Sequence, residues 1–324
     1  MSPSPRIRTI GVDIGGTKVV AGVVDESGKV LSVVRKRTPH RSKTPDVVED
    51  TIVEAVHELA TTHEVAGVGV GAAGFVDSNR STILFSPHLS WRKEPLKEAL
   101  ERRLDLPVVI DNDANTTAWA ELRFGAGRGY AQLLCVTMGT GIGGALVVDG
   151  RVFRGANGMA GEFGHMQVVP GGRRCECGNR GCWEQYSSGN TLVREARELV
   201  AANSPVAHRL RALCQEDSAV LTGPMVTAAA RDGDPAAVEL FHEIGAWLGT
   251  GIASLCAAFD PECVIIGGGV SEAGDLLLEP ARDALRRTLA GRGFRPEPLV
   301  VRAHLGADAG FIGAADMARS EAAR

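Results

Sequence analysis

The same order of strands and glycine turns occurs twice in this chain. Residues 9–31 read TIGVDIGGTKVVAGVVDESGKVL, and residues 133–153 read LLCVTMGTGIGGALVVDGRVF. Each segment predicts a strand, a Gly-rich turn, a second strand, another turn and a third strand. Helical segments and further strands follow each copy. We therefore expect two related α/β lobes that face each other across a cleft, a duplication whose period is too long for a solenoid.

Apolar spacing along the rest of the chain supports an α/β fold. Short apolar runs predict strands in VAGVGVGAAG, LPVVI, ECVIIG and residues 299–304. Helical spacing is found at residues 44–63, 95–104, 116–124, 189–202, 206–214, 224–231, 235–258, 275–289 and 310–318. Strands that alternate with helices predict parallel or mixed sheets covered on their faces.

Composition narrows the class of protein. The chain has 324 residues, 44% hydrophobic and 23% charged, which is ordinary for a globular protein. A net charge of −4 does not indicate binding to nucleic acid or to an anionic membrane, both of which attract basic proteins. Two uncharged runs, 133–148 and 244–259, are too short to span a bilayer, so we expect two buried strands and a buried helix. Residues 1–9 lack an apolar signal core, and we expect an irregular N-terminus on a cytoplasmic protein.

Three cysteines and a histidine lie within eighteen residues of one another: His165, Cys175, Cys177 and Cys182. Three thiolates and one imidazole complete a tetrahedral Zn²⁺ site, and a site with no open position is structural. Scattered cysteines or a disulfide are the alternatives. The other four cysteines lie alone, however, the total is odd, and nothing marks the chain as secreted. Glu162 and Glu184 flank the cluster, so a folded zinc knot would hold both acids against one cavity.

Three glycine turns could hold phosphates. In GVDIGGTK, the backbone of Gly15 and Gly16, the Thr17 hydroxyl and Lys18 suit an anion, whereas Asp13 suits Mg²⁺ held through water. The second turn contains Thr140 and Gly141, and the third, with Gly268 and Gly269, ends a buried strand where adenine could lie. A glycine-rich turn taken alone is more often a plain tight turn than a phosphate-binding loop. The chain has no Walker loop, and GTGIGG precedes a strand rather than the long helix of a dinucleotide fingerprint.

An acid follows the predicted strand LPVVI. Because ligands of α/β sheets bind at the carboxyl ends of strands, Asp113 could accept the proton of an attacking hydroxyl in phosphoryl transfer. The alternative, an N-cap by Asp113 or Asn115 for the helix at 116–124, is equally compatible with this segment. Asp111 is interpreted as a charged turn residue.

These segments together resemble the ROK family of bacterial sugar kinases (repressor, open reading frame, kinase). GVDIGGTK, IDNDAN, MGTGIGG, GEFGH…CECGNRGCWEQY and IIGGGVS occur in the family's order over residues 10–318. GAAGFVD, LFSPHLSWRKEPLK and RFGAG look most like the glucokinases of high-GC Gram-positive bacteria. The resemblance implies a two-lobed actin/hexokinase-like (ribonuclease H-like) fold. It implies a small lobe of residues 1–113 plus 305–324 and a larger lobe, 114–304, that carries the zinc knot and a dimer interface.

The resemblance also implies roles for the candidate residues. Asp113 would be the catalytic base, and the sugar would be bound by Gly74, Asn112, Asp113, Glu162, His165 and Glu184. His165 would ligate zinc through its other ring nitrogen, together with Cys175, Cys177 and Cys182. Phosphates would lie on Gly15, Gly16, Thr17, Lys18, Thr140 and Gly141, with Mg²⁺ near Asp13 and adenosine over Gly268 and Gly269.

The activity implied is ATP-dependent phosphorylation of glucose at its 6-hydroxyl by a homodimer or homotetramer. Another hexose kinase of the family, acting on mannose, N-acetylmannosamine or fructose, is the alternative, and polyphosphate could replace ATP. A sugar-responsive repressor is a more remote alternative. Family repressors carry a helix-turn-helix before the kinase-like part, whereas here the first phosphate turn begins at Gly11.

Overall fold

The computed structural model describes residues 7–322, so most of the predicted irregular N-terminus lies outside the described residues. The chain divides into two units, which are described separately. Unit 1 comprises Met1–Ala131, Ala145–Gly161 and His304–Arg324, and unit 2 comprises Gln132–Gly144 and Glu162–Ala303. This division differs from the predicted boundary after Asp113, because the helix that begins there packs on the last helix of unit 1.

Unit 1 is built on a five-stranded sheet of order β3-β2-β1-β4-β8. The strands are β1 (Thr9–Ile14), β2 (Lys18–Val24), β3 (Val30–Arg37), β4 (Val68–Ala72) and β8 (Val108–Asn112). The predicted strand–turn–strand–turn–strand is confirmed, since β2 pairs antiparallel with both β1 and β3. β1, β4 and β8 run parallel, so their carboxyl ends share one edge of the sheet.

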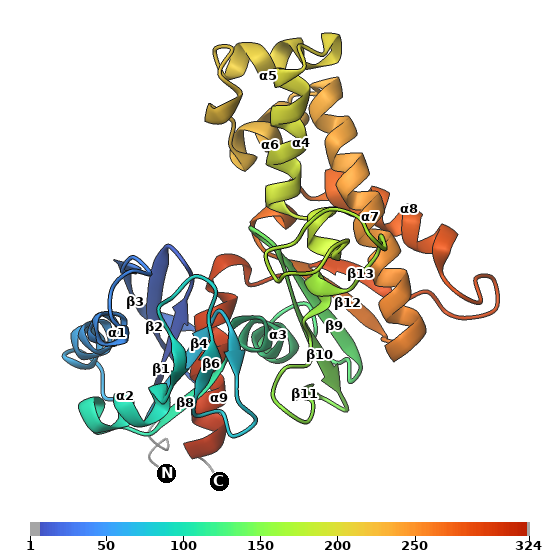
Figure 1. Ribbon diagram of the computed structural model, residues 1–324. Coiled ribbons are helices and arrows are strands. Elements are labelled where there is room, and N and C mark those ends of the chain that lie inside the picture. The colour runs from blue at the N-terminus through green and yellow to red at the C-terminus, as the bar shows by residue number, and fades with distance from the viewer. Residues whose placement is uncertain (1–6, 323–324) are drawn as a thin grey trace. The chain divides into compact units, whose positions relative to one another are not determined.

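Helices cover both faces of this sheet (Figure 1). Alternate residues along β2 point to opposite faces, so Val19 and Val23 belong to one apolar cluster and Val20 and Val24 to another. The first cluster includes buried residues of α1 (Pro45–Ala60) and α2 (Leu96–Leu104). The second includes buried residues of α3 (Asp113–Phe124) and α9 (Ala309–Ala322).

Glycines let α9 lie directly on the strands. A Cβ on Gly11 would overlap the carbonyl of Phe311, and one on Gly69 would overlap the carbonyl of Ala314. The helix backbone therefore occupies the space that side chains would need, and no larger residue fits at these two strand positions.

A small second sheet in unit 1 was not predicted. Its strands are β5 (Phe75–Val76), β6 (Ile83–Phe85) and β7 (Arg92–Glu94), paired antiparallel in the order β5-β6-β7. These strands are too short to show a period of two in the sequence. Between β6 and β7 the chain forms a loop anchored by two buried side chains, Leu89 and Trp91.

The second copy of the pattern forms β9 (Leu133–Met138), β10 (Ile142–Val148) and β11 (Arg151–Phe153). With β12 (Cys263–Gly267) and β13 (Leu299–Arg302) they form a sheet of order β11-β10-β9-β12-β13. The expectation that residues 133–148 form two buried strands is confirmed, and the division between the units falls within β10.

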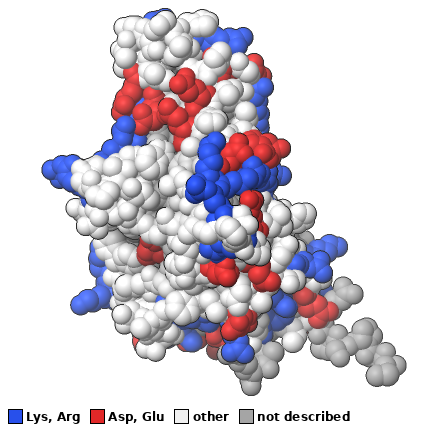
Figure 2. All heavy atoms as spheres, turned by 90° about the vertical axis from the view of Figure 1, so that its right-hand side faces the viewer, with Lys and Arg blue, Asp and Glu red and all other residues white. Residues whose placement is uncertain are grey.

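The helices of unit 2 follow the zinc-knot segment. They are α4 (Gly189–Ala201), α5 (His208–Leu213), α6 (Gly223–Arg231), α7 (Pro235–Phe259) and α8 (Asp275–Thr288). The predicted buried helix at 244–259 lies in α7, whose Gly245 and Gly249 are close to the backbone of α8. Within the described residues, no helix has the length and apolar character needed to cross a bilayer. On the face shown in Figure 2, basic and acidic side chains are interspersed.

Candidate active site

In unit 1 the candidate residues meet at one edge of the sheet. The register places Asp13 beside Gly71, Gly71 beside Asp111, and Ala72 beside Asn112. Asp113 begins α3 directly after β8. The acid that was predicted to hold Mg²⁺ and the acid that was predicted to accept a proton therefore lie at the carboxyl ends of parallel strands, where ligands of such sheets bind.

Asn112 fixes the position of this junction. Its side-chain oxygen accepts hydrogen bonds from the backbone N–H of Ala114 at 2.8 Å and of Asn115 at 3.2 Å, and it caps α3. The alternative of a cap by Asp113 or Asn115 was wrong, because α3 begins three residues earlier than predicted. The amide nitrogen of Asn112 donates to the carbonyl of Gly74 at 3.1 Å, which joins two predicted sugar-binding residues.

The two acids influence each other. Burial raises the pKa of Asp113 above its ordinary value, although the N–H of Ala114 opposes this by donating to its carboxylate at 3.0 Å. Burial, with the charge of Asp113, raises the pKa of Asp13 to about 7, while Lys18 acts in the opposite sense. Two carboxylates at one partly buried edge suit a divalent cation, which would relieve their repulsion and favour the ionised form of both.

The first glycine turn lies beside these acids. The backbone N–H of Gly15 donates to the carbonyl of Lys18 at 3.0 Å and closes the turn, and Gly16, Thr17 and Lys18 are exposed. Thr38 braces it, since its hydroxyl donates to the carbonyl of Gly15 at 2.8 Å and its N–H donates to the carbonyl of Thr17 at 3.1 Å. Sequence reasoning missed Thr38, because nothing in its own segment indicates this contact.

Asp111 is not the charged turn residue that was predicted. Its side chain is 2% exposed, and its Oδ2 accepts hydrogen bonds from Nε of Arg154 at 2.8 Å and from Nη2 at 2.5 Å. Its Oδ1 accepts from the backbone N–H of Asn112 and from Nδ2 of Asn115, both at 2.9 Å. The carboxylate is buried because β8 continues through residue 112 and because a cation from a distant segment pairs with it.

In unit 2 the four predicted zinc ligands come together. One ligand atom from each of His165, Cys175, Cys177 and Cys182 lies within 4.8 Å of every other. Nδ1 of His165 is 3.7 Å from Sγ of Cys175, and the Sγ atoms of Cys177 and Cys182 are 3.6 Å apart. Three sulfurs and one imidazole nitrogen at this spacing fit a structural Zn²⁺ site.

The local fold explains how a short loop gathers these ligands. Gly178 and Gly181 have φ of +94° and +80°, which residues with a Cβ rarely adopt. The N–H of Cys175 donates to the carbonyl of Asn179 at 2.9 Å and closes a tight turn. Directly after Cys182, the buried indole of Trp183 donates to the carbonyl of Trp247 in α7 at 2.8 Å and anchors the knot.

Glu184 joins the cluster of His165 and the three cysteines to the second glycine turn. Its Oε1 accepts from Sγ of Cys175 at 3.0 Å and lies 3.6 Å from Nδ1 of His165, while its Oε2 accepts from the N–H of Ile142 at 3.4 Å. Glu162 lies on the other side of the imidazole, with Oε2 3.9 Å from Nε2. One ring nitrogen of His165 thus faces the thiols and the other faces Glu162. This orientation suits a histidine that would bind a metal through one nitrogen and a sugar hydroxyl through the other.

The other two glycine turns lie close together in unit 2. The N–H of Gly189 donates to the carbonyl of Gly139 at 2.8 Å, so the start of α4 contacts the turn that contains Thr140 and Gly141. Gly268 has φ of +79°, and a Cβ there would lie against the backbone of Met138, the last residue of β9. The structure therefore brings together the turns after β9 and β12.

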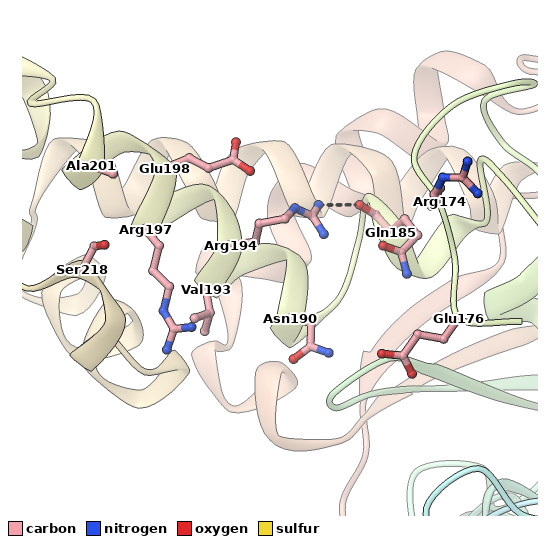
Figure 3. A pocket seen from close by; sticks show the side chains of 10 residues that line it. All are labelled: Arg174, Glu176, Gln185, Asn190, Val193, Arg194, Arg197, Glu198, Ala201 and Ser218. Carbon is pink, nitrogen blue, oxygen red and sulfur yellow. Dashed lines mark hydrogen bonds between the residues drawn. The ribbon is translucent and has the colours of Figure 1, made fainter. Parts of the chain in front are cut away.

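A pocket of about 610 Å³ lies along α4. Figure 3 shows its lining, in which Arg194 donates to the carbonyl of Gln185 at 2.7 Å. The N–H of Asn190, which lines it, donates to the carbonyl of Thr140 at 3.3 Å, so the pocket begins beside the second glycine turn. Sequence reasoning missed this pocket; arginines at 194 and 197, one helical turn apart, were the available signal. Gly268 and Gly269 are not among the residues that line it.

Comparison with known proteins identifies the family. The model of the ROK family matches residues 9–321. The chain belongs to the ROK family. A glucokinase of Streptomyces coelicolor is 48% identical over 96% of this chain and 97% of its own length. Among solved structures, a ROK family glucokinase from Streptomyces griseus in complex with glucose and AMPPNP is 48% identical, with a TM-score of 0.89 over 97% of this chain and 99% of that chain.

A more distant ROK structure has the same fold. The ROK hexokinase from Thermus thermophilus is 35% identical, with a TM-score of 0.80 over 97% of this chain and 99% of that chain. The predictions of ROK family membership and of the family's actin/hexokinase-like α/β fold are therefore confirmed.

Proposed function

We propose that this protein is an ATP-dependent glucokinase that produces glucose 6-phosphate, with Asp113 as the catalytic base. Identity of 48% to glucokinases over nearly the whole chain supports the enzyme class and the substrate. The observation that carries the role of Asp113 is its place at the carboxyl end of β8, on the same sheet edge as Asp13 and the turn at Gly15–Lys18.

Phosphoryl transfer requires an aligned nucleophile, neutralised phosphate charge and a proton acceptor. In the proposed reaction the 6-oxygen of glucose attacks the γ-phosphorus of ATP, the bond from phosphorus to the β–γ bridging oxygen breaks, and ADP leaves with that electron pair. Asp113 accepts the proton of the 6-hydroxyl. Gly15, Gly16, Thr17 and Lys18 bind phosphate oxygens, and Asp13 holds Mg²⁺, which supplies positive charge beside them when bound.

The residues of unit 2 supply sugar and nucleotide binding in this proposal. Glu162, His165 and Glu184 hydrogen-bond sugar hydroxyls, because carboxylates accept strongly from pairs of hydroxyl donors. Zn²⁺ held by His165, Cys175, Cys177 and Cys182 fixes the loop that positions them. Thr140 and Gly141 bind phosphate, Gly268 and Gly269 lie under adenosine, and the pocket beside Asn190 receives part of the nucleotide.

A coupled assay tests the proposal. We expect glucose-dependent consumption of ATP in the presence of Mg²⁺, with a higher kcat/KM for glucose than for mannose, N-acetylmannosamine or fructose, and for ATP than for polyphosphate. Absence of glucose-dependent turnover would contradict it, and a higher kcat/KM for another sugar or donor would assign one of the alternatives. A homodimer or homotetramer in the cytoplasm is proposed with it, and sedimentation of the purified protein tests the assembly.

A further inference from the structure

The loop between β6 and β7 holds one exposed histidine in a fixed place. The hydroxyl of Ser86 donates to the carbonyl of Ala73 at 2.7 Å. Nη1 of Arg92 donates to the carbonyls of Ser86 at 2.7 Å, Leu89 at 3.2 Å and Trp91 at 2.6 Å. Ser86, Leu89 and Trp91 are buried, whereas His88 between them is exposed. A loop tied at both ends positions the backbone of His88 and leaves its imidazole available.

His88 lies over the first phosphate turn. A Cβ built on Gly16 would be 3.1 Å from Cβ of His88 and 3.4 Å from its Cγ. A side chain at residue 16 would press on His88, so glycine favours this close approach to the turn. The histidine is also near the candidate base, since a positive charge on His88 lowers the pKa of Asp113 against the larger effect of burial.

These two neighbours define the position of the reacting group. In the proposed kinase reaction, on which this inference rests, the turn binds the phosphates of ATP and Asp113 accepts the proton from the sugar, so the transferred phosphoryl group passes between them. We propose that His88 donates a ring N–H hydrogen bond to an oxygen of that phosphoryl group. A neutral imidazole carries one such donor and a protonated imidazole carries two, and His88 neither gains nor loses a proton in the step. Its contribution is to stabilise the charge on the oxygens as the phosphorus changes partners.

The competing interpretation is an ordinary solvated histidine on a surface loop. The variants His88→Ala and His88→Gln distinguish the two, with His57→Ala, an exposed histidine on α1, as the matched control. Affinities are measured for glucose alone, for ADP, and for AMPPNP, the β,γ-imido analogue of ATP. ADP lacks the γ-phosphoryl group, so a contact to that group changes the affinity for the analogue and not the affinity for ADP.

We expect His88→Ala to lower kcat about 100-fold, as loss of one preorganised donor does. Its affinity for the imido analogue should fall, while its affinities for ADP and glucose stay within about twofold of wild type. His88→Gln, which keeps an N–H donor, should recover part of kcat. A kcat for His88→Ala within about twofold of wild type would overturn the proposal, as would a parallel loss of all three affinities. If wild type itself lacks glucose-dependent turnover, the proposed function fails as well.

Discussion

Arg154 holds the buried carboxylate of Asp111 through two guanidinium N–H groups, with Nε at 2.8 Å and Nη2 at 2.5 Å from Oδ2. Asp111 in turn accepts hydrogen bonds from Asn112 and Asn115, one on each side of Asp113. The ion pair therefore fixes the junction between β8 and α3, and with it the backbone that carries the proposed base.

Replacing Arg154 tests how much this ion pair contributes to the free energy of unfolding. Arg154→Met removes the cation that is hydrogen-bonded to the 2% exposed carboxylate of Asp111 and leaves only Arg80, whose Nε is 3.9 Å from Oδ2, so we expect the free energy of unfolding to fall. The fall should be roughly 3 kcal/mol, because a buried charge that loses its hydrogen-bonded partner is poorly compensated. Urea unfolding measures the change, and Arg151→Met, at an exposed arginine on the adjacent strand, is the control. Equal stability of the two variants would contradict the assigned role.

Removing the acid of Asp113 tests the proposed base. Asp113→Asn should keep the affinity for glucose measurable by calorimetry, because the amide still forms hydrogen bonds. Turnover should fall about 10²–10⁴-fold, the usual contribution of a positioned proton acceptor. Asp50→Asn, a change in an exposed acid on α1, should leave turnover unchanged. Retention of more than a tenth of wild-type kcat in Asp113→Asn would rule out the assignment.

Local patterns in the sequence predicted several side chains that the structure brings together. Asp13 and Asp113 were predicted from strand ends and a glycine turn, and the Cys/His cluster was predicted from ligand spacing, because these are properties of short segments. Contacts between distant segments were not found. The sequence around Asp111 predicts a charged turn residue, because its partner Arg154 lies in another segment.

The same limit applies to the fold. The strands of both copies and α1, α2 and α7 agree with the apolar spacing that predicted them. The strands β5, β6 and β7 have two or three residues each, too few for a periodic signal. Glycine is required at position 69 because the backbone of α9, which is distant in the sequence, packs against that strand.

Loss of one thiol tests the zinc knot. Cys177→Ala removes one of the four clustered ligand atoms, so the affinity for Zn²⁺ should fall and the loop with Glu162 and Glu184 should loosen. We expect the KM for glucose to rise at least tenfold, in step with the metal content measured by mass spectrometry. Cys214→Ala, at a cysteine outside the cluster, should retain the wild-type KM for glucose and the wild-type metal content. An unchanged KM in metal-free protein would separate the metal from sugar binding.

The raised pKa of Asp13 predicts how stability depends on pH. An acid whose pKa rises on folding binds its proton more tightly in the folded state, so its stabilising contribution is complete below about pH 4 and is lost as the pH rises through about 7. The difference in unfolding free energy between Asp13→Asn and wild type should grow over this window and stay constant above it. Urea unfolding without added Mg²⁺ measures this, and a difference independent of pH would contradict it.

A single methyl group tests the contact between α9 and the sheet. A Cβ at Gly69 would overlap the backbone of Ala314, so Gly69→Ala should destabilise unit 1 by about 2 kcal/mol or more. Gly223→Ala, whose added Cβ would meet only Val193 at 3.8 Å, should change stability little. Thermal unfolding followed by circular dichroism compares the two variants, and equal melting temperatures would show that α9 can move aside.

Because α9 packs on the first sheet, unit 1 can complete its core during translation only after unit 2, although most of unit 1 is synthesised first. Strands β1 to β4 leave the ribosome early, yet Phe311 and Ile312, which cover one face of their sheet, are made only after every segment of unit 2. The segments of unit 2 all precede α9, so that unit can complete its core while the nascent first sheet still exposes apolar surface. Chaperone binding to stalled nascent chains should therefore persist until α9 has emerged.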